Sequence, residues 1–156
     1  MWKKIIALEM LFLICLSLFC GCKQNGEFVW LHEAYEQQWI SKEDLKNIAF
    51  NYNSKHYKWS VDYGSDFSPS GVPSGELSDG VRKSTKQAFC RKNKISINLY
   101  SEVTISSEYY GFFNGCYIVD LSTSCIVGGD PVIFEEYELG GVKFYNYHYI
   151  GVYKEG

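Results

Sequence analysis

The sequence lacks a hydrophobic run long enough to cross a membrane. Its longest uncharged apolar stretch, residues 10–20, has eleven residues and is broken only by Ser17. A transmembrane helix needs about 20 predominantly apolar residues, so the stretch disfavours a permanent span. The sequence also lacks an excess of positive charge, since 15 lysines and arginines stand against 18 aspartates and glutamates. This balance gives no electrostatic footprint for nucleic acid, and we expect no nucleic-acid partner.

Metal-binding patterns are missing as well. The sequence has no C-x-x-C pair and no cluster of cysteines and histidines at zinc-ligand spacing, so we expect no metal and no cofactor. Three cysteines, Cys90, Cys116 and Cys125, follow the first 22 residues. Because three is an odd number, at least one of them is unpaired. Buried free thiols are the expected state, and a disulfide between Cys116 and Cys125 stays open as an alternative.

The first 22 residues contain the parts of a secretory signal. A short basic segment with Lys3 and Lys4 is followed by the apolar run, and Gly21 stands just before Cys22. This ending resembles the lipobox of bacterial lipoproteins, although Phe19 and Cys20 replace the leucine and the small residue that the pattern prefers. The resemblance implies that Cys22 is acylated, as by diacylglycerol and palmitate. Two acyl chains hold a protein stably on a membrane.

This resemblance sets the expected organisation. Residues 1–21 form a lipoprotein signal peptide, residues 22–28 a tether, and residues 29–156 a single domain. The expected location is the cell membrane, lipid-anchored through Cys22 and facing the extracytoplasmic side, with membrane lipid as a partner. An ordinary secreted protein that is cut nearby is the alternative.

Charge is divided unevenly along the remaining chain. Six basic residues stand together with no acid among them, whereas residues 95–156 hold eight acids and two bases. The basic block comprises Arg82, Lys83, Lys86, Arg91, Lys92 and Lys94. The two regions either face each other or are simply solvated. Alternatively, the basic block turns toward anionic lipid.

Helical periodicity and capping signals predict three helices, over residues 29–38, 42–53 and 79–93. Ser41 and Asp44 match a capping-box variant at the start of the second helix. Ile40 and Leu45 then occupy the two positions of a hydrophobic staple, so we expect them to be buried together. The first two helices should form an αα-hairpin.

The second half of the sequence is typical of strands. Apolar residues alternate over residues 95–105, which predicts a half-buried strand. Asn114-Gly115 and Gly140-Gly141 each separate two strand-like runs and predict hairpins. Together these patterns indicate an α+β fold. The αα-hairpin and the third helix would pack on one face of a mainly antiparallel sheet of about four or five strands.

Three short motifs carry a further resemblance. The chain has E-A-Y at residues 33–35, E-D-L-K-N-I-A at 43–49 and Y-Y-G-F-F-N-G at 109–115. It resembles small lipoproteins of Gram-positive bacteria that share E-A-Y…E-D-L-K-x-I-A and Y-Y-G-x-x-N-G. Those proteins usually have a glycine near Gln37 or Gln38 and a tyrosine at the place of Phe113. The resemblance implies a shared α+β fold and carries over no activity.

Candidate catalytic residues are few. His32, Glu33 and Glu36 read as H-E-x-x-E, close to a zinc helix, but no third ligand is evident and a solvated helix face is favoured. Cys116 and His148 could form a nucleophile and base, which would make the protein a cell-envelope hydrolase. An inert, buried Cys116 is the favoured alternative, because apolar residues follow it in the sequence.

Aromatic residues are abundant near the C-terminus. Tyr145, Tyr147 and Tyr149 alternate and are expected on one face of a strand, with Phe144 on the other. Either face could be core, or could form an aromatic platform for an envelope glycan or protein. In the absence of a convincing catalytic constellation, the sequence favours a membrane-anchored, non-enzymatic binding or interaction module.

Overall fold

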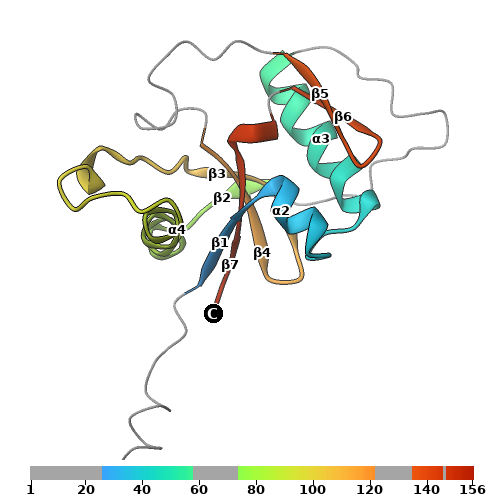
Figure 1. Ribbon diagram of the computed structural model, residues 1–156. Coiled ribbons are helices and arrows are strands. Elements are labelled where there is room, and N and C mark those ends of the chain that lie inside the picture. The colour runs from blue at the N-terminus through green and yellow to red at the C-terminus, as the bar shows by residue number, and fades with distance from the viewer. Residues whose placement is uncertain (1–25, 58–73, 122–134, 146) are drawn as a thin grey trace, which may run out of the picture.

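The computed structural model describes residues 26–57, 74–121, 135–145 and 147–156, and all structural statements below concern these residues. They form seven strands, three α-helices and two 3₁₀ helices (Figure 1). The strands are β1 (Glu27–Trp30), β2 (Gly75–Glu76), β3 (Glu108–Phe113), β4 (Cys116–Asp120), β5 (Glu136–Leu139), β6 (Val142–Tyr145) and β7 (Ile150–Lys154). The helices are α2 (Leu31–Glu36), α3 (Lys42–Tyr57), α4 (Asp79–Lys92), η1 (Tyr100–Glu102) and η2 (Tyr147–Tyr149).

The main sheet has five strands in the order β1-β7-β4-β3-β2, and every neighbouring pair is antiparallel. At its centre, β4 pairs with β7 from Cys116 opposite Lys154 to Asp120 opposite Ile150. The predicted α+β class and antiparallel sheet are confirmed. No helix in these ranges is long and apolar enough to cross a bilayer.

The helices cover both faces of this sheet. Helices α2 and α3 lie on one side and α4 on the other (Figure 1). The expectation that all three would share a face is therefore wrong. The physical reason lies in the central strand, where Ile118 and Val119 are adjacent, both fully buried and directed to opposite faces. A strand that is apolar on both sides needs cover on both sides.

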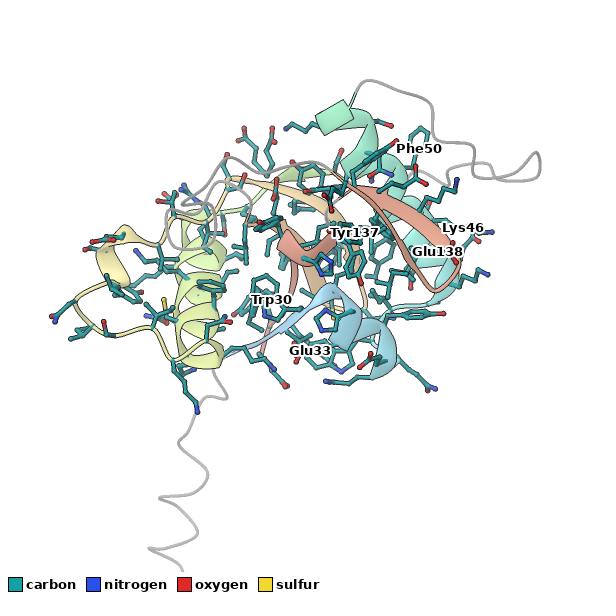
Figure 2. The ribbon with its side chains drawn as sticks, turned by 45° about the horizontal axis from the view of Figure 1, so that its top comes forward. Trp30, Glu33, Lys46, Phe50, Tyr137 and Glu138 are labelled. Carbon is teal, nitrogen blue, oxygen red and sulfur yellow. The ribbon has the colours of Figure 1, made fainter. Side chains whose placement is uncertain are left out.

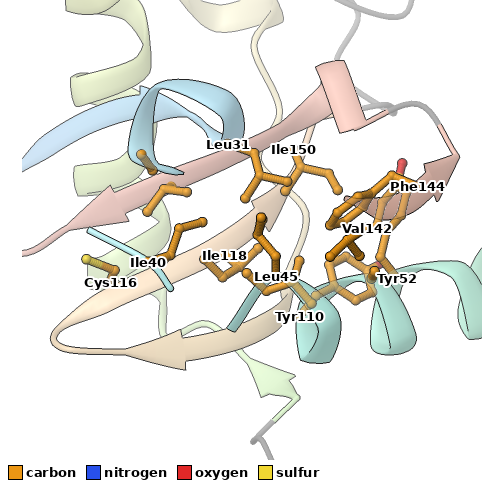
Figure 3. Packing of buried hydrophobic residues seen from close by; sticks show 14 of the residues in the cluster. Leu31, Ile40, Leu45, Tyr52, Tyr110, Cys116, Ile118, Val142, Phe144 and Ile150 are labelled. Atoms are coloured by element: carbon orange, nitrogen blue, oxygen red, sulfur yellow. The ribbon is translucent and has the colours of Figure 1, made fainter. Parts of the chain in front are cut away.

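The α2/α3 side holds the larger core (Figure 3). Ile40 and Leu45 are both buried in it, so both positions of the predicted staple lie in the same core. Other members come from α3, from the main sheet and from β6; the labelled ones include Tyr52, Tyr110, Ile118, Phe144 and Ile150. The first two helices thus serve packing, as their apolar periodicity predicted.

The α4 side holds a second core built on aromatic rings. Phe28 of β1 meets Trp30 and Phe89 edge to face, with ring centroids 5.3 Å apart in both pairs. Such edge-to-face pairs contribute about 0.5–1.5 kcal/mol beyond the burial of their area. Because Phe28 belongs to this core and Glu27 pairs with Lys154, the sheet begins at Glu27. Glu27 and Phe28, which the sequence assigned to a tether over residues 22–28, therefore belong to β1, and the first helix begins at Leu31 rather than at residue 29.

Both predicted hairpins are present. Asn114 and Gly115 adopt φ angles of 50° and 76°, and Gly140 and Gly141 adopt 59° and 77°. Positive φ at both central residues is the requirement of a type I′ turn, which matches the twist of the flanking strands. At Gly140 a Cβ atom would lie 2.7 Å from the ring of Tyr35, so helix α2 packs directly on this turn.

The second hairpin, β5–β6, forms a small sheet of its own on helix α3. Asn53 of α3 binds this hairpin through two hydrogen bonds. The amide nitrogen of Asn53 donates to the carbonyl of Lys143 at 3.2 Å, and its amide oxygen accepts from the N–H of Tyr145 at 3.3 Å. The buried amide thus replaces a neighbouring strand for β6. These two hydrogen bonds hold β6 on α3.

Residues 95–105 do not form the predicted strand. They contain turns and the 3₁₀ helix η1. Val103 and Ile105 are buried in the second core, but Ile97 is 84% exposed and Leu99 is 42% exposed. The alternation therefore marks separate contacts along an irregular segment rather than the two faces of a strand.

Candidate functional site

The best candidate site is a group of four rings where α2, β5 and η2 meet. We call it the aromatic–histidine cluster: His32, Tyr137, Tyr147 and His148. His32 stands at the start of α2, which is placed by the packing of Tyr35 on the turn at Gly140. Figure 2 shows Tyr137 beside Glu138 on β5; alternation along the strand directs them to opposite sides.

The four rings lie close enough to form one surface. The ring centroid of His148 is 4.2 Å from that of Tyr147 and 4.7 Å from that of Tyr137. Tyr147 is 5.9 Å from Tyr137 and 6.5 Å from His32. His148 is exposed, and the other three side chains are half-buried. Tyr147 thus packs against the first core, whereas the cluster as a whole remains partly open to solvent.

Phe144 supports the cluster from below. It is fully buried, and its ring centroid lies 6.2 Å from that of Tyr147. Of the aromatic residues predicted as binding candidates, only Tyr147 belongs to the cluster. Tyr145 and Tyr149 are half-buried, and their backbones bond to Asn53 and to the N–H of Leu121. The expected alternation on one strand is wrong, because β6 ends at Tyr145 and a 3₁₀ turn follows.

The charges of the cluster depend on pH. Although His148 is exposed, its partial desolvation and, next, the positive charge of His32 lower the pKa of His148 below its ordinary value of 6.5. A positive charge on His32 thus opposes the protonation of His148. Tyr137 donates a hydrogen bond to the carboxylate of Glu135 at 2.8 Å, and this bond contributes most to raising the pKa of Tyr137. At neutral pH the surface is therefore polar at its edges and uncharged at Tyr137 and His148.

Cys116 and His148 are not brought together. They lie at opposite ends of the β4–β7 pair. Cys116 pairs with Lys154 at one end, and His148 comes two residues before Ile150, which pairs with Asp120 at the other end. The length of β4 alone separates these ends by about 13 Å. Cys116 is a free, buried thiol, and burial raises its pKa. The thiol–imidazole pair that the sequence offered for a hydrolase is absent, and Cys116 packs in the core instead.

Glu33, the first glutamate of the H-E-x-x-E pattern on α2, has a structural role. Glu33 accepts a hydrogen bond from the N–H of Trp30 and one from Lys92, both at 2.8 Å. Burial acts to raise its pKa, but these bonds and the charge of Lys92 outweigh that effect and lower it. Within the part of the chain that the structure describes, no three acidic, histidine or cysteine side chains are grouped to hold a metal.

A polar groove of about 650 Å³ lies elsewhere, where the described chain begins at Gly26. Arg91 and Lys154 line it together with Glu27 and Glu155. The guanidinium of Arg91 donates to the carbonyl of Gly26 at 3.1 Å. The groove thus contains charges of both signs, which can neutralise each other, and it offers no cluster of rings.

Comparison of the chain with models of protein families, with curated proteins and with solved structures gives no match. The candidate site therefore rests on geometry alone. Sequence reasoning considered His32 only as part of a zinc pattern, did not single out Tyr137 and assigned His148 to another partner. No local pattern could have grouped these residues, because His32 on α2 is distant in the sequence from Tyr137, Tyr147 and His148.

Proposed function

We propose that this protein is a membrane-anchored, extracytoplasmic lipoprotein that binds a glycan of the cell envelope and does not catalyse a reaction. The observation that carries the binding role is the aromatic–histidine cluster, whose rings are held by three elements and remain accessible. The lipobox-like ending at Cys22 supports the anchor.

A sugar suits the chemistry of this surface. The C–H groups of a pyranose carry small positive charges and pack against the electron-rich face of an aromatic ring. Tyrosine adds a hydroxyl that can bond to the sugar, and it loses little conformational freedom because it has only two side-chain torsions. The imidazoles of His32 and His148 add hydrogen-bonding groups at the edge of the same surface.

The binding role is tested by replacing a ring of the cluster. The full-length chain in detergent is titrated with soluble envelope glycans, including peptidoglycan fragments. Tyr147→Ala should weaken binding about tenfold, which corresponds to about 1.4 kcal/mol. Phe112→Ala is the matched control, because it removes an aromatic ring that is 38% exposed but lies on β3 outside the cluster. Equal loss in both variants, or no loss with Tyr147→Ala, would contradict the proposal.

The anchor is tested separately by labelling cells with a fatty-acid analogue. Cys22→Ser should abolish labelling and either release the protein from the membrane or stall its processing. Cys20→Ser should leave the labelling intact. Labelling that follows Cys20 would instead place the cleavage two residues earlier.

A further inference from the structure

The segment after α4 exposes two aliphatic side chains. Ile97 is 84% exposed and Leu99 is 42% exposed, and they are two of the four large hydrophobic residues found exposed in the described ranges. Both ends of the segment are held by the second core, because Ile95 packs against this core and Val103 is buried in it. In Figure 1 this yellow segment extends beyond α4, away from the sheet. Ile97 and Leu99 therefore project from a fixed base.

Basic side chains precede this projection on α4 and just after it. No acidic residue occurs from Gly80 to Ser101, a stretch that contains all six residues of the basic block. Lys83, Arg91, Lys92 and Lys94 are exposed, and Lys86 lies 4.4 Å from the ring centroid of Tyr100. Two of the six basic residues are paired with acids: Lys92 with Glu33 at 2.8 Å and Arg82 with Asp79 at 3.6 Å. Glu102 follows on η1, and Glu27 and Glu155 line the groove together with Arg91.

Lys94 has an unusual backbone conformation for a residue with a side chain. The N–H of Ile95 bonds to the carbonyl of Cys90 at 3.0 Å, and that of Lys94 bonds to the carbonyl of Arg91 at 3.3 Å. This is the Schellman arrangement at a helix end, in which glycine usually occupies the left-handed position. Lys94 occupies it here with φ 52°. A positive charge is thus retained three residues before Ile97 where glycine would be less strained.

The anchor would bring this segment close to lipid. Arg91, in the last turn of α4, bonds to the carbonyl of Gly26. Cys22 lies four positions before Gly26 in the sequence, so the two residues can be at most about 14 Å apart. If Cys22 carries lipid, as the proposed function holds, then the end of α4 is tethered within that reach of the bilayer.

We propose that the 94–99 loop docks on an anionic phospholipid surface, with Ile97 and Leu99 inserted into the interface and the basic block facing the headgroups. This inference rests on the proposed lipid anchor. A protein interface involves about 20–30 residues on each side, whereas the apolar part of this projection is two side chains. A small aliphatic tip within a basic field instead matches the pattern of peripheral membrane binding.

The experiment uses the full-length chain on vesicles with an environment-sensitive fluorescent amino acid in place of Ile97. The same amino acid in place of Glu138, an exposed position on β5, is the control. Vesicles of phosphatidylglycerol and phosphatidylcholine carry brominated acyl chains as quenchers. We expect at least a twofold stronger quenching at position 97 than at 138, which is lost in pure phosphatidylcholine. Lys83→Glu with Lys94→Glu should also reduce it.

Equal exposure of both positions to water would overturn the docking, as would quenching that ignores lipid charge. Shielding at position 97 that depends on protein concentration in the absence of vesicles would point to a second copy and would also overturn it. Fatty-acid labelling of Cys22 in the same preparation reports on the anchor. Because the fluorophore reports on position 97 alone, failure of the anchor and failure of the docking give different results.

Discussion

Ser41 and Asp44 cap helix α3 reciprocally. The N–H of Ser41 donates to the carboxylate of Asp44 at 2.7 Å, and the N–H of Asp44 donates to the hydroxyl of Ser41 at 3.1 Å. Two backbone donors that would otherwise lack an intrahelical partner are thereby satisfied. This pair confirms the capping box predicted from the sequence.

Removal of this cap should destabilise the protein moderately. Ser41→Ala is expected to lower the free energy of unfolding by about 0.5–2 kcal/mol, because the N–H of Asp44 loses its acceptor. Ser54→Ala, at an exposed position within the same helix, is the matched control and should change stability by less than about 0.5 kcal/mol. Denaturant melts monitored by circular dichroism would measure both. If both variants have the same free energy of unfolding, the cap does not stabilise the protein.

The core under α3 should be far more sensitive. Leu45 is completely buried, so Leu45→Ala should cost about 2–5 kcal/mol through lost apolar burial and the cavity that remains. The same melts measure this loss, which should exceed that of Ser41→Ala. Unchanged stability together with lost ligand binding would mean that this helix is a recognition surface.

Helix α2 ends at a strained residue that can be improved. Gln38 has φ 60°, and the N–H of Trp39 bonds to the carbonyl of Ala34 at 2.9 Å, which is again the Schellman arrangement. Gln38→Gly should raise the free energy of unfolding by up to about 1 kcal/mol, because glycine adopts the left-handed region without strain. Gln37→Gly is the control. Gln37 has φ −82°, so glycine there should give no gain in the midpoint of urea unfolding.

Acidification should weaken the fold through the aromatic–histidine cluster. The pKa of His148 is lowered in the folded state, so the folded protein favours the neutral imidazole. The resulting stability is full above the unfolded pKa of about 6.5 and is lost as pH falls through the lower folded pKa. His148→Gln should therefore reduce the loss of stability between pH 7.5 and 5. His32→Gln, which removes the opposing charge, should have a smaller effect in the same direction.

Melts at several pH values would compare these variants with the unaltered protein. If all three chains lose the same stability on acidification, the imidazoles do not interact with the fold as described. Titration of His148 followed by NMR would give its pKa directly. An upward shift of that pKa would contradict the burial argument.

Local chemistry made several features predictable. The turns at Asn114-Gly115 and Gly140-Gly141 require positive φ at both positions, which these residues tolerate better than others. The cap of α3 depends on two residues that are three apart. Such features are specified within four residues, so the sequence predicts them without knowledge of the remaining chain. The α+β class follows from their order along the chain.

Tertiary structure decided the features that depend on distant partners. Val119 and Ile118 needed cover on both faces, and so α4 packs opposite α2 and α3. The alternating residues that predicted a strand form turns and a 3₁₀ helix instead, with Ile97 exposed and Val103 buried. The aromatic–histidine cluster formed only because folding joined α2, β5 and η2. Periodicity specifies which residues share a face, but only packing determines what that face meets.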